Sequence, residues 1–349
     1  MNATSVDWGT RARPVDSVLD TAGFTPMVRL RRLTGDVSAD ILVKLEYFGP
    51  SGSVKDRILP VLVRRAVERG TLRPGMTIIE ATTGNTGIAT AMTAAAHGYP
   101  AVIVMPEGMS DERKKAIRAY GARLELTPGG ESDVDLVLDR VRAIKAQEPD
   151  RYWEVGQFSN LDNIEAHYRT TGPEVWEQTS GSLDAFVDAQ GTGGTLTGVA
   201  RYLRERREHI AVYAAEPSEC PILAGGGWGP HRIEGIGDGF IPDNLHIELL
   251  TGVIEVSSDE AIDMARRLSR EEGIFCGISS GCNVAAALKL ARRRPELRSI
   301  VTLICDNGLR YLSTELCGVE SALDVPDRDH PTSESDGQKL QGHPLEVIR

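Results

Sequence analysis

Short apolar runs alternate with helical segments along most of the chain, and this alternation limits the possible folds more than any other feature. The run TIIEA at residues 77–81 is followed by the loop TTGNTG, an alanine-rich segment and the apolar run AVIVMPE. The alternation resumes after residue 153 with AFVDA, the loop GTGGT, AVYAAEP and finally SIVTLICD. Strand, helix and strand at this spacing are typical of parallel sheets. The sequence therefore predicts a doubly wound α/β fold in two units.

One lysine stands apart from the others in its local pattern. Lys55 is the only lysine between Lys44 and Lys114, and it follows the turn GPSGS and precedes an amphipathic run. A position near a helix N-terminus, with partial desolvation, lowers the pKa of a lysine and frees its amine to act as nucleophile or base. Taken alone, however, this pattern more often marks an ordinary solvated lysine on the first turn of a helix.

Three glycine-containing loops also follow predicted strands or open predicted helices. The loop GTGGT at 191–195 can direct its amides to a phosphate at a helix N-terminus, although a tight turn gives the same pattern. It lacks both the third glycine of the dinucleotide fingerprint and the GK[ST] of a P-loop. The loop TTGNTG at 82–87 suits a carboxylate, and also an ordinary N-cap at Thr83 or Asn85. GISSG at 277–281 equally fits a helix-capping turn.

The lysine and the three loops occur in the order and approximate spacing of the fold-type II pyridoxal phosphate enzymes. Over about residues 17–317 the chain resembles the cysteine synthase and cystathionine β-synthase family. The resemblance implies two doubly wound open-sheet domains, as in the tryptophan synthase β-like fold. Residues 1–45 and 155–319 would form the larger, phosphate-binding domain, and residues 46–154 a smaller mobile domain that carries TTGNTG. Residues 320–349 lose apolar periodicity and are predicted to form a flexible tail.

The resemblance also implies pyridoxal 5'-phosphate as cofactor and a set of residues that contact it. The expected cofactor-binding residues are Lys55, Asn85, Gly191, Thr192, Gly193, Gly194, Thr195 and Ser279. The expected substrate-binding residues are Thr82, Thr83, Asn85, Thr86, Gln157 and Gly235. Lys55 would be the catalytic residue, forming a Schiff base with the cofactor and removing the substrate α-proton. Thr83 replaces a serine of many cysteine synthases, and Asp238 replaces a small residue.

Ser279 bears on the class of reaction, because the resemblance places it opposite the pyridine nitrogen of the cofactor. A neutral hydroxyl does not keep that nitrogen protonated as an aspartate would, so the ring is a weaker electron sink. Prompt loss of a group from the substrate β-carbon is then favoured over transamination or decarboxylation. The implied activity is cysteine synthase, which converts O-acetyl-L-serine and sulfide to L-cysteine and acetate through an α-aminoacrylate.

Two alternatives to cysteine synthesis remain open from the sequence. One is cystathionine synthesis from serine and homocysteine, and the other is β-replacement with another nucleophile, such as the amine used in 2,3-diaminopropionate formation. Thr83 and Asp238 keep this last alternative open. O-Phosphoserine is disfavoured as donor, because Glu234 and Asp238 place acidic groups in the segment that would meet its phosphate.

Composition limits the classes of partner that the protein is expected to bind and the cellular compartment in which it is expected to function. A net charge of -11 gives no electrostatic footprint for nucleic acid or an anionic membrane. No apolar run approaches the roughly 18 residues that span a bilayer, and the N-terminus lacks the apolar region of a signal peptide. The five cysteines form no CxxC pair and the seven histidines show no metal-ligand spacing, so we expect a cytoplasmic protein without a metal site. The resemblance adds a homodimer, and serine acetyltransferase as a further partner.

Overall fold

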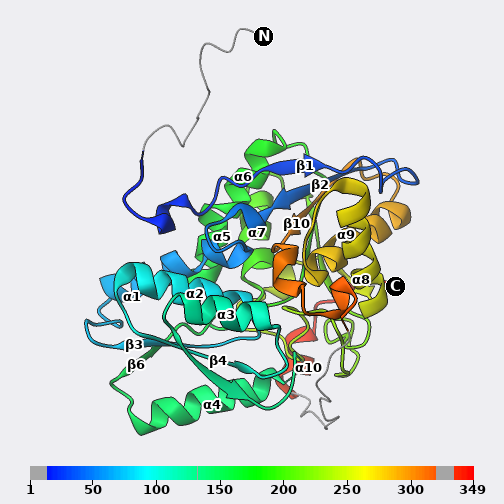
Figure 1. Cartoon of the computed structure of the whole chain (residues 1–349). Helices are drawn as coiled ribbons and strands as arrows, with labels where there is room; N and C mark the ends of the chain where they lie inside the picture. The colour runs from blue at the N-terminus through cyan, green and yellow to red at the C-terminus, as the bar shows by residue number, and fades with distance from the viewer. Residues whose placement is uncertain (1–13, 132, 320–333) are drawn as a thin grey trace.

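Two sheets organise the structure, a computed structural model that describes residues 14–131, 133–319 and 334–349 (Figure 1). The larger sheet has the strand order β1-β2-β10-β7-β8-β9-β11, and the smaller has the order β5-β4-β3-β6. Every pair of neighbouring strands in the described residues is parallel except β1 and β2. Parallel strands and intervening helices confirm the predicted α/β class.

The strands of the larger sheet are β1 (Met27–Arg29), β2 (Asp40–Leu45), β7 (Ala185–Ala189), β8 (Ala211–Pro217), β9 (Gly252–Val256), β10 (Ser299–Ile304) and β11 (Glu346–Ile348). Those of the smaller sheet are β3 (Thr77–Ala81), β4 (Ala101–Pro106), β5 (Arg123–Thr127) and β6 (Tyr152–Glu154). The α-helices are α1 (Leu59–Glu68), α2 (Asn85–His97), α3 (Asp111–Ala119), α4 (Val134–Gln147), α5 (Asp162–Arg169), α6 (Thr171–Gln178), α7 (Gly194–Arg204), α8 (Ser258–Arg267), α9 (Ile278–Arg293) and α10 (Glu334–Leu340).

The smaller sheet is buried on both faces, which explains why its central strands are continuous apolar runs. Ile78 packs into a cluster with Ile88 of α2 and Ile117 of α3, while the next residue, Ile79, packs with Val141 of α4. Successive side chains of a strand point to opposite faces, so both must be apolar when helices cover both sides. Figure 1 shows α2 and α3 on one side of this sheet and α4 on the other.

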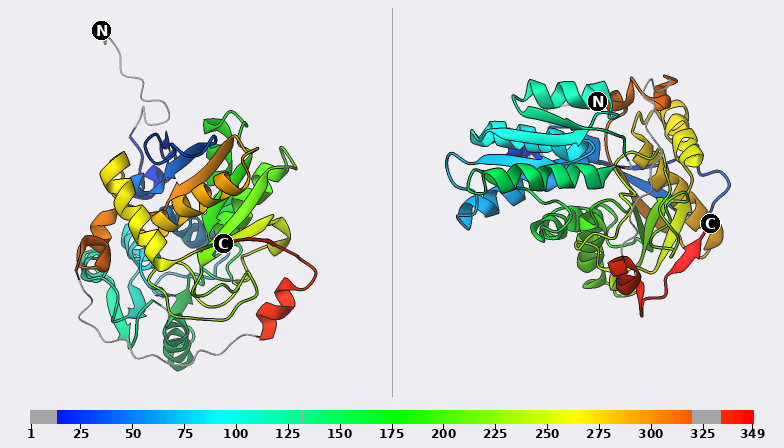
Figure 2. Two further views of the ribbon diagram at one scale, coloured as in Figure 1. Left: turned by 90° about the vertical axis from the view of Figure 1, so that its right-hand side faces the viewer. Right: turned by 90° about the horizontal axis from the view of Figure 1, so that it is seen from below.

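The larger sheet repeats this arrangement with its own helices. Val187 of β7 belongs to a core with Val284 of α9, whereas its neighbour Phe186 packs with Val199 of α7. In the right-hand view of Figure 2, seen from below, the two sheets and their helices form two lobes side by side. None of the described helices is long and apolar enough to cross a membrane.

Each sheet has one point at which the strand order reverses. In the smaller sheet the chain proceeds from β3 to β4 and β5 on one side, and returns to place β6 on the other. In the larger sheet β8 and β9 lie on one side of β7, and β10 lies on the other. Loops that leave the carboxyl ends of strands at such switch points diverge and leave a crevice, the usual ligand site of open α/β sheets.

The C-terminal segment corrects one prediction, because residues 334–349 do not form the flexible tail expected from the sequence. Lys339 of α10 donates to the carbonyl oxygen of Ile241 at 2.5 Å, and β11 extends the larger sheet beside β9. The hydroxyl of Tyr213 donates to Glu346 at 2.7 Å. Figure 2 shows α10 at the edge of the molecule, followed by the strand that leads to the C-terminus. Residues 320–333, also predicted to belong to the tail, lie outside the described residues.

Candidate active site

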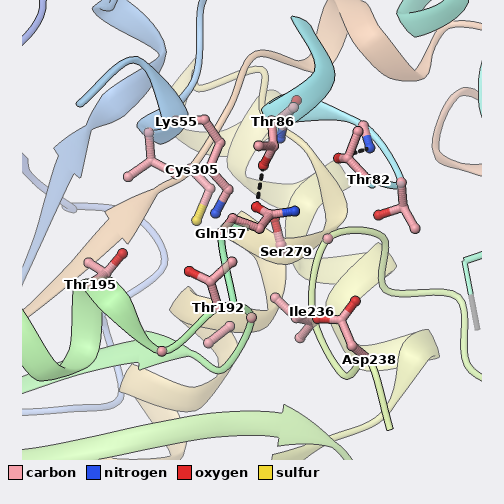
Figure 3. A pocket seen from close by; sticks show the side chains of 18 of the residues that line it. Lys55, Thr82, Thr86, Gln157, Thr192, Thr195, Ile236, Asp238, Ser279 and Cys305 are labelled. Carbon is pink, nitrogen blue, oxygen red and sulfur yellow. Dashed lines mark hydrogen bonds between the residues drawn. The ribbon is translucent and has the colours of Figure 1, made fainter. Parts of the chain in front are cut away.

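One pocket opens between the switch points of the two sheets and brings together the residues singled out from the sequence (Figure 3). Its lining includes Lys55, Thr82, Thr83, Asn85, Thr86, Gln157, Gly191, Thr192, Gly193, Thr195, Gly235 and Ser279. Gly194 is the one predicted site residue absent from this lining, since it packs behind the loop against Asn163. Segments far apart in the sequence therefore meet at one place.

Lys55 lies on a short 3-10 turn, Val54–Arg57, just before α1, and not on the first turn of the α-helix itself. Asp56 fixes the entry to this turn by accepting the amide N–H of Ser51 at 2.9 Å. Arg57 fixes the exit, because its buried guanidinium donates to Glu46 and to Glu174. Asp56 thus holds the turn before Lys55 and Arg57 holds the chain after it, while the side chain of Lys55 extends into the pocket (Figure 3).

The loop at 191–195 turns sharply between β7 and α7. Gly193 has φ of +79°, in the left-handed region, and a Cβ there would lie 2.7 Å from the backbone nitrogen of Leu245. Gly194 begins α7, and a Cβ on it would lie 2.1 Å from the Oδ1 atom of Asn163. Glycine is therefore required at both positions, for conformation at one and for space at the other. The first amides of α7 are left without helical acceptors, as in anion-binding loops.

The loop at 82–86 enters α2 at the opposite wall of the pocket. The hydroxyl of Thr86 donates to the Oε1 atom of Gln157 at 2.5 Å, which joins the loops after β3 and β6. The hydroxyl of Thr83 donates to Glu131 at 2.8 Å, so it is already engaged by the protein. The Nδ2 atom of Asn85 donates to Asp306 at 2.7 Å, while its buried Oδ1 atom has no partner among the described residues.

Acidic side chains near Lys55 give the pocket its electrostatic character. Burial raises the pKa of Asp188 to about 7, and the Asn283 amide and the Lys55 charge act against this increase. Burial likewise raises the pKa of Asp238 to about 6, again opposed by Lys55. Both carboxyls line the pocket with the lysine (Asp238 is labelled in Figure 3). Near neutral pH the site therefore holds two titratable carboxyls in the same pocket as the Lys55 amine.

Sequence reasoning overlooked three residues that line or close this pocket: Asp188, Cys305 and Arg113. Asp188 lies on β7 near its carboxyl end, and Cys305 directly follows β10. These are the two strands that flank the switch point of the larger sheet, so the strand order would have indicated both residues. Arg113 lies on α3, and no local pattern distinguishes it from the other basic residues of that helix.

The family model described as "Pyridoxal-phosphate dependent enzyme" matches residues 18–306. The chain belongs to this family. A cysteine synthase of Staphylococcus aureus is 46% identical over 305 residues, which cover 87% of this chain and 97% of the relative. The larger part of both chains is therefore shared.

Solved structures agree with this assignment. The cysteine synthase of Entamoeba histolytica superposes with a TM-score of 0.84 at 39% identity, covering 97% of this chain and 99% of that one. An O-ureido-L-serine synthase superposes with a TM-score of 0.81 at 43% identity, covering 89% of this chain and 98% of that one. The fold-type II architecture and the dependence on pyridoxal phosphate that the sequence predicted are thus confirmed.

The pocket fits the cofactor of the family. The glycine-lined turn at the N-terminus of α7 offers backbone amides of the kind that bind a phosphate. Lys55 offers an amine within the same pocket, and Ser279 at the start of α9 offers a neutral hydroxyl. The buried Oδ1 atom of Asn85 lacks a partner that a bound group could supply. In the described residues no cluster of three or more His, Cys, Asp or Glu side chains is placed to hold a metal ion.

Proposed function

We propose that this protein is a cysteine synthase, which replaces the β-substituent of O-acetyl-L-serine with sulfide and yields L-cysteine and acetate. The observation that carries the proposal is the convergence of Lys55, the loop 191–195 and the loop 82–86 on one pocket. An amine, a phosphate site and a carboxylate site are what the cofactor and an α-amino acid require together. The similarity to the cysteine synthase of Staphylococcus aureus, at 46% identity, supports the same activity.

In this proposal Lys55 holds the cofactor covalently and then moves the α-proton of the substrate, while the loop 191–195 holds the phosphate. Bound pyridoxal phosphate supplies an electron-accepting ring that stabilises negative charge at the substrate α-carbon. Ser279, at the start of α9, would offer the bound ring a neutral hydroxyl, which favours immediate departure of the β-substituent. The free first-turn amides of α2, at Asn85 and Thr86, bind the substrate carboxylate at the positive end of the helix dipole.

The acidic segment 234–238 is less repulsive to an anionic donor than its sequence indicates. Glu234 forms an ion pair with the buried guanidinium of Arg113, so its charge is compensated. No such ion pair is found for Asp238 among the described residues, and Lys55 is the charged group that lowers its pKa. The argument against O-phosphoserine therefore rests on Asp238 alone.

A second candidate function is β-replacement by a nucleophile that arrives with a proton to lose. Asp238 carries a carboxyl whose pKa, raised to about 6 by burial, suits a general base. Such a group would favour an amine or a neutral thiol over an anion. The solved O-ureido-L-serine synthase, at 43% identity, is a relative with a different named product. A screen of sulfide, homocysteine and small amines with O-acetyl-L-serine separates this candidate, and cystathionine synthesis, from cysteine synthesis.

The proposed function is tested by Lys55→Ala. The purified wild-type protein should show the visible absorbance of protein-bound pyridoxal phosphate and form cysteine from O-acetyl-L-serine and sulfide. The variant should lose the covalently bound cofactor band and turnover together, because the side chain that holds the cofactor is gone. Normal turnover by the variant, or a wild-type protein that stays colourless with added cofactor, would contradict the proposal.

We further propose a cytoplasmic homodimer that binds the C-terminal tail of serine acetyltransferase, as the family resemblance implies. Sedimentation of the holoenzyme tests the dimer. A pull-down with the tail peptide tests the partner, and added O-acetyl-L-serine should weaken it if the peptide occupies the active site.

A further inference from the structure

Glu131 joins the two walls of the pocket without lining it. Its Oε1 atom accepts the hydroxyl of Thr83 at 2.8 Å and the amide N–H of Gly235 at 2.6 Å. Thr83 belongs to the loop after β3 of the smaller sheet, and Gly235 belongs to the segment that follows β8 of the larger sheet. One carboxyl oxygen therefore ties together two segments that come from different sheets.

The environment of Glu131 marks this contact as a built feature of the fold. Its side chain is buried, and its Oε2 atom has no partner within the described residues. Burial raises the pKa of Glu131 to about 8, with Glu234 and Asp238 acting in the same direction and the hydrogen bonds from Gly235 and Thr83 opposing them. A buried carboxyl with these two donors orders both of them, because either donor left unpaired would carry a desolvation cost.

A second contact joins the same two parts of the chain, at the residue next to Gly235. Arg113 of α3 pairs with Glu234, and its guanidinium lies 4.4 Å from the centre of the Tyr311 ring. The Tyr311 hydroxyl donates to Asp306 at 2.8 Å, and Asp306 also accepts the side chain of Asn85. The segment at 234–235 is thus held against the smaller sheet at two adjacent residues. Glu131 differs from Arg113 in that both of its partners line the pocket.

We propose that Glu131 is a positioning residue that sets the affinity of the pocket for its amino-acid substrate by tying Thr83 to Gly235. This inference rests on the proposed function, because Thr83 and Gly235 line the pocket and are both among the expected substrate-binding residues. Glu131 acts through them and touches neither the substrate nor the cofactor. The hydroxyl of Thr83 donates to Glu131 in this connection.

The position of the contact predicts which kinetic constants depend on it. Without the carboxyl oxygen, Thr83 and Gly235 lose a shared acceptor and the amino-acid site opens between them. Part of the binding free energy of the amino acid must then be used to restore that arrangement, which weakens the apparent affinity. The second substrate attacks after the amino acid is bound, so its KM should not change. This separation of the two KM values distinguishes positioning from general loss of structure.

The experiment uses holoenzyme of the wild type, Glu131→Ala, Glu131→Gln and Glu112→Ala. Glutamine keeps an acceptor oxygen, whereas alanine removes it. Glu112 is the matched control, because it accepts the Ser313 hydroxyl at 2.6 Å between the same two parts of the chain but in an exposed position. Affinity is measured as the change in visible absorbance of the bound cofactor with L-alanine, which binds as an amino acid but has no β-leaving group.

Glu131→Ala should weaken L-alanine binding and raise the KM for O-acetyl-L-serine by about tenfold, the effect of losing one or two buried hydrogen bonds. The KM of Glu131→Ala for sulfide should stay within about threefold of the wild-type value. For Glu131→Gln and Glu112→Ala, the L-alanine affinity and both KM values should stay within the same threefold range. If Glu131→Ala does not fold, Glu131→Asp replaces it, because its shorter side chain cannot reach both the Thr83 hydroxyl and the Gly235 amide, and it should weaken L-alanine binding relative to Glu131→Gln.

Equal L-alanine affinities in Glu131→Ala and wild type would overturn the inference. A Glu131→Gln variant as weak as Glu131→Ala would also overturn it, because charge and not the acceptor oxygen would then be responsible. Failure of the proposed function gives a different result. A wild type that binds L-alanine but forms no cysteine refutes cysteine synthesis alone, while the difference between the variants still tests Glu131.

Discussion

Arg57→Met should destabilise the protein far more than its single lost charge would indicate. The guanidinium of Arg57 donates to Glu46 at 2.5 and 2.9 Å, to Glu174 at 2.8 Å through two nitrogens, and to Thr25 at 3.1 Å. Burial alone would lower the pKa of Arg57, and the two carboxylates outweigh this and raise it. Lys44 is the remaining cation, bonded to Glu174 at 2.7 Å. The substitution leaves two buried carboxylates with one cation.

Removing one partner of a buried ion pair typically costs about 3–5 kcal/mol, and the compensation by Lys44 places this case near about 3 kcal/mol. Arg29→Met is the matched control, because Arg29 pairs with Asp40 at 2.8 Å where both side chains are nearly half exposed. Such an exposed pair contributes about 0–1 kcal/mol. Urea unfolding followed by circular dichroism should therefore separate the two variants clearly.

The pH dependence gives a second test of the same reasoning. Burial acts to raise the pKa of Glu174, but its bonds to Arg57 and Lys44 lower it to about 2, from an ordinary value of 4.5. A depressed carboxyl pKa stabilises the fold fully above 4.5, and this stabilisation is lost as the pH falls toward 2. A shift of this size corresponds to about 3 kcal/mol. The difference between wild type and Arg57→Met should shrink across that range; a constant difference, or a loss below about 1 kcal/mol at neutral pH, would refute the argument.

Two further substitutions test the cofactor loop and the C-terminal strand. Gly194→Ala should reduce the affinity for the cofactor at least about tenfold, because its Cβ would overlap buried Asn163. Gly35→Ala is the control, since no atom lies within 4 Å of its Cβ, and it should bind the cofactor as the wild type does in an absorbance titration. Glu346→Ala should lower the free energy of unfolding by about 1–2 kcal/mol, since it leaves the Tyr213 hydroxyl without its acceptor, and amide exchange in β11 should accelerate. Unchanged exchange there would show that the strand pairs independently of this bond.

Most of the architecture could be predicted because strand and helix signals in this chain agree with the final packing. The runs at 77–81 and 101–106 are buried on both faces. Parallel strands covered by helices on both sides need apolar residues at most positions, so a continuous apolar run predicts them. β11 could not be found in the same way. Glu346–Ile348 is a strand of three residues at a sheet edge, and Glu346 contacts Tyr213 and Arg294, which lie far from it in the sequence. Local periodicity over three residues cannot carry that information.

The predicted site residues met in one pocket because strand order, and not local sequence, brings their loops together. The loops at 82–86 and 191–195 each follow a strand at a switch point, so a doubly wound topology places both at a crevice. The pairings between side chains are a different matter. Thr83 and Glu131 are 48 residues apart, and Arg113 and Glu234 are 121 apart. No pattern in the sequence pairs them.

These unpredicted pairings change the chemistry inferred from the sequence. Glu234 and Asp238 look alike as two acids in one glycine-rich segment, and together they indicate repulsion of an anionic donor. In the fold Arg113 forms an ion pair with the first, while the second lines the same pocket as Lys55, whose charge lowers its pKa. The two carboxyls therefore have different surroundings, because one is paired with a buried cation and the other lines the pocket with Lys55. Because Arg113 compensates the charge of Glu234, we expect substitutions of Asp238 to change the choice of donor and nucleophile more than substitutions of Glu234 do.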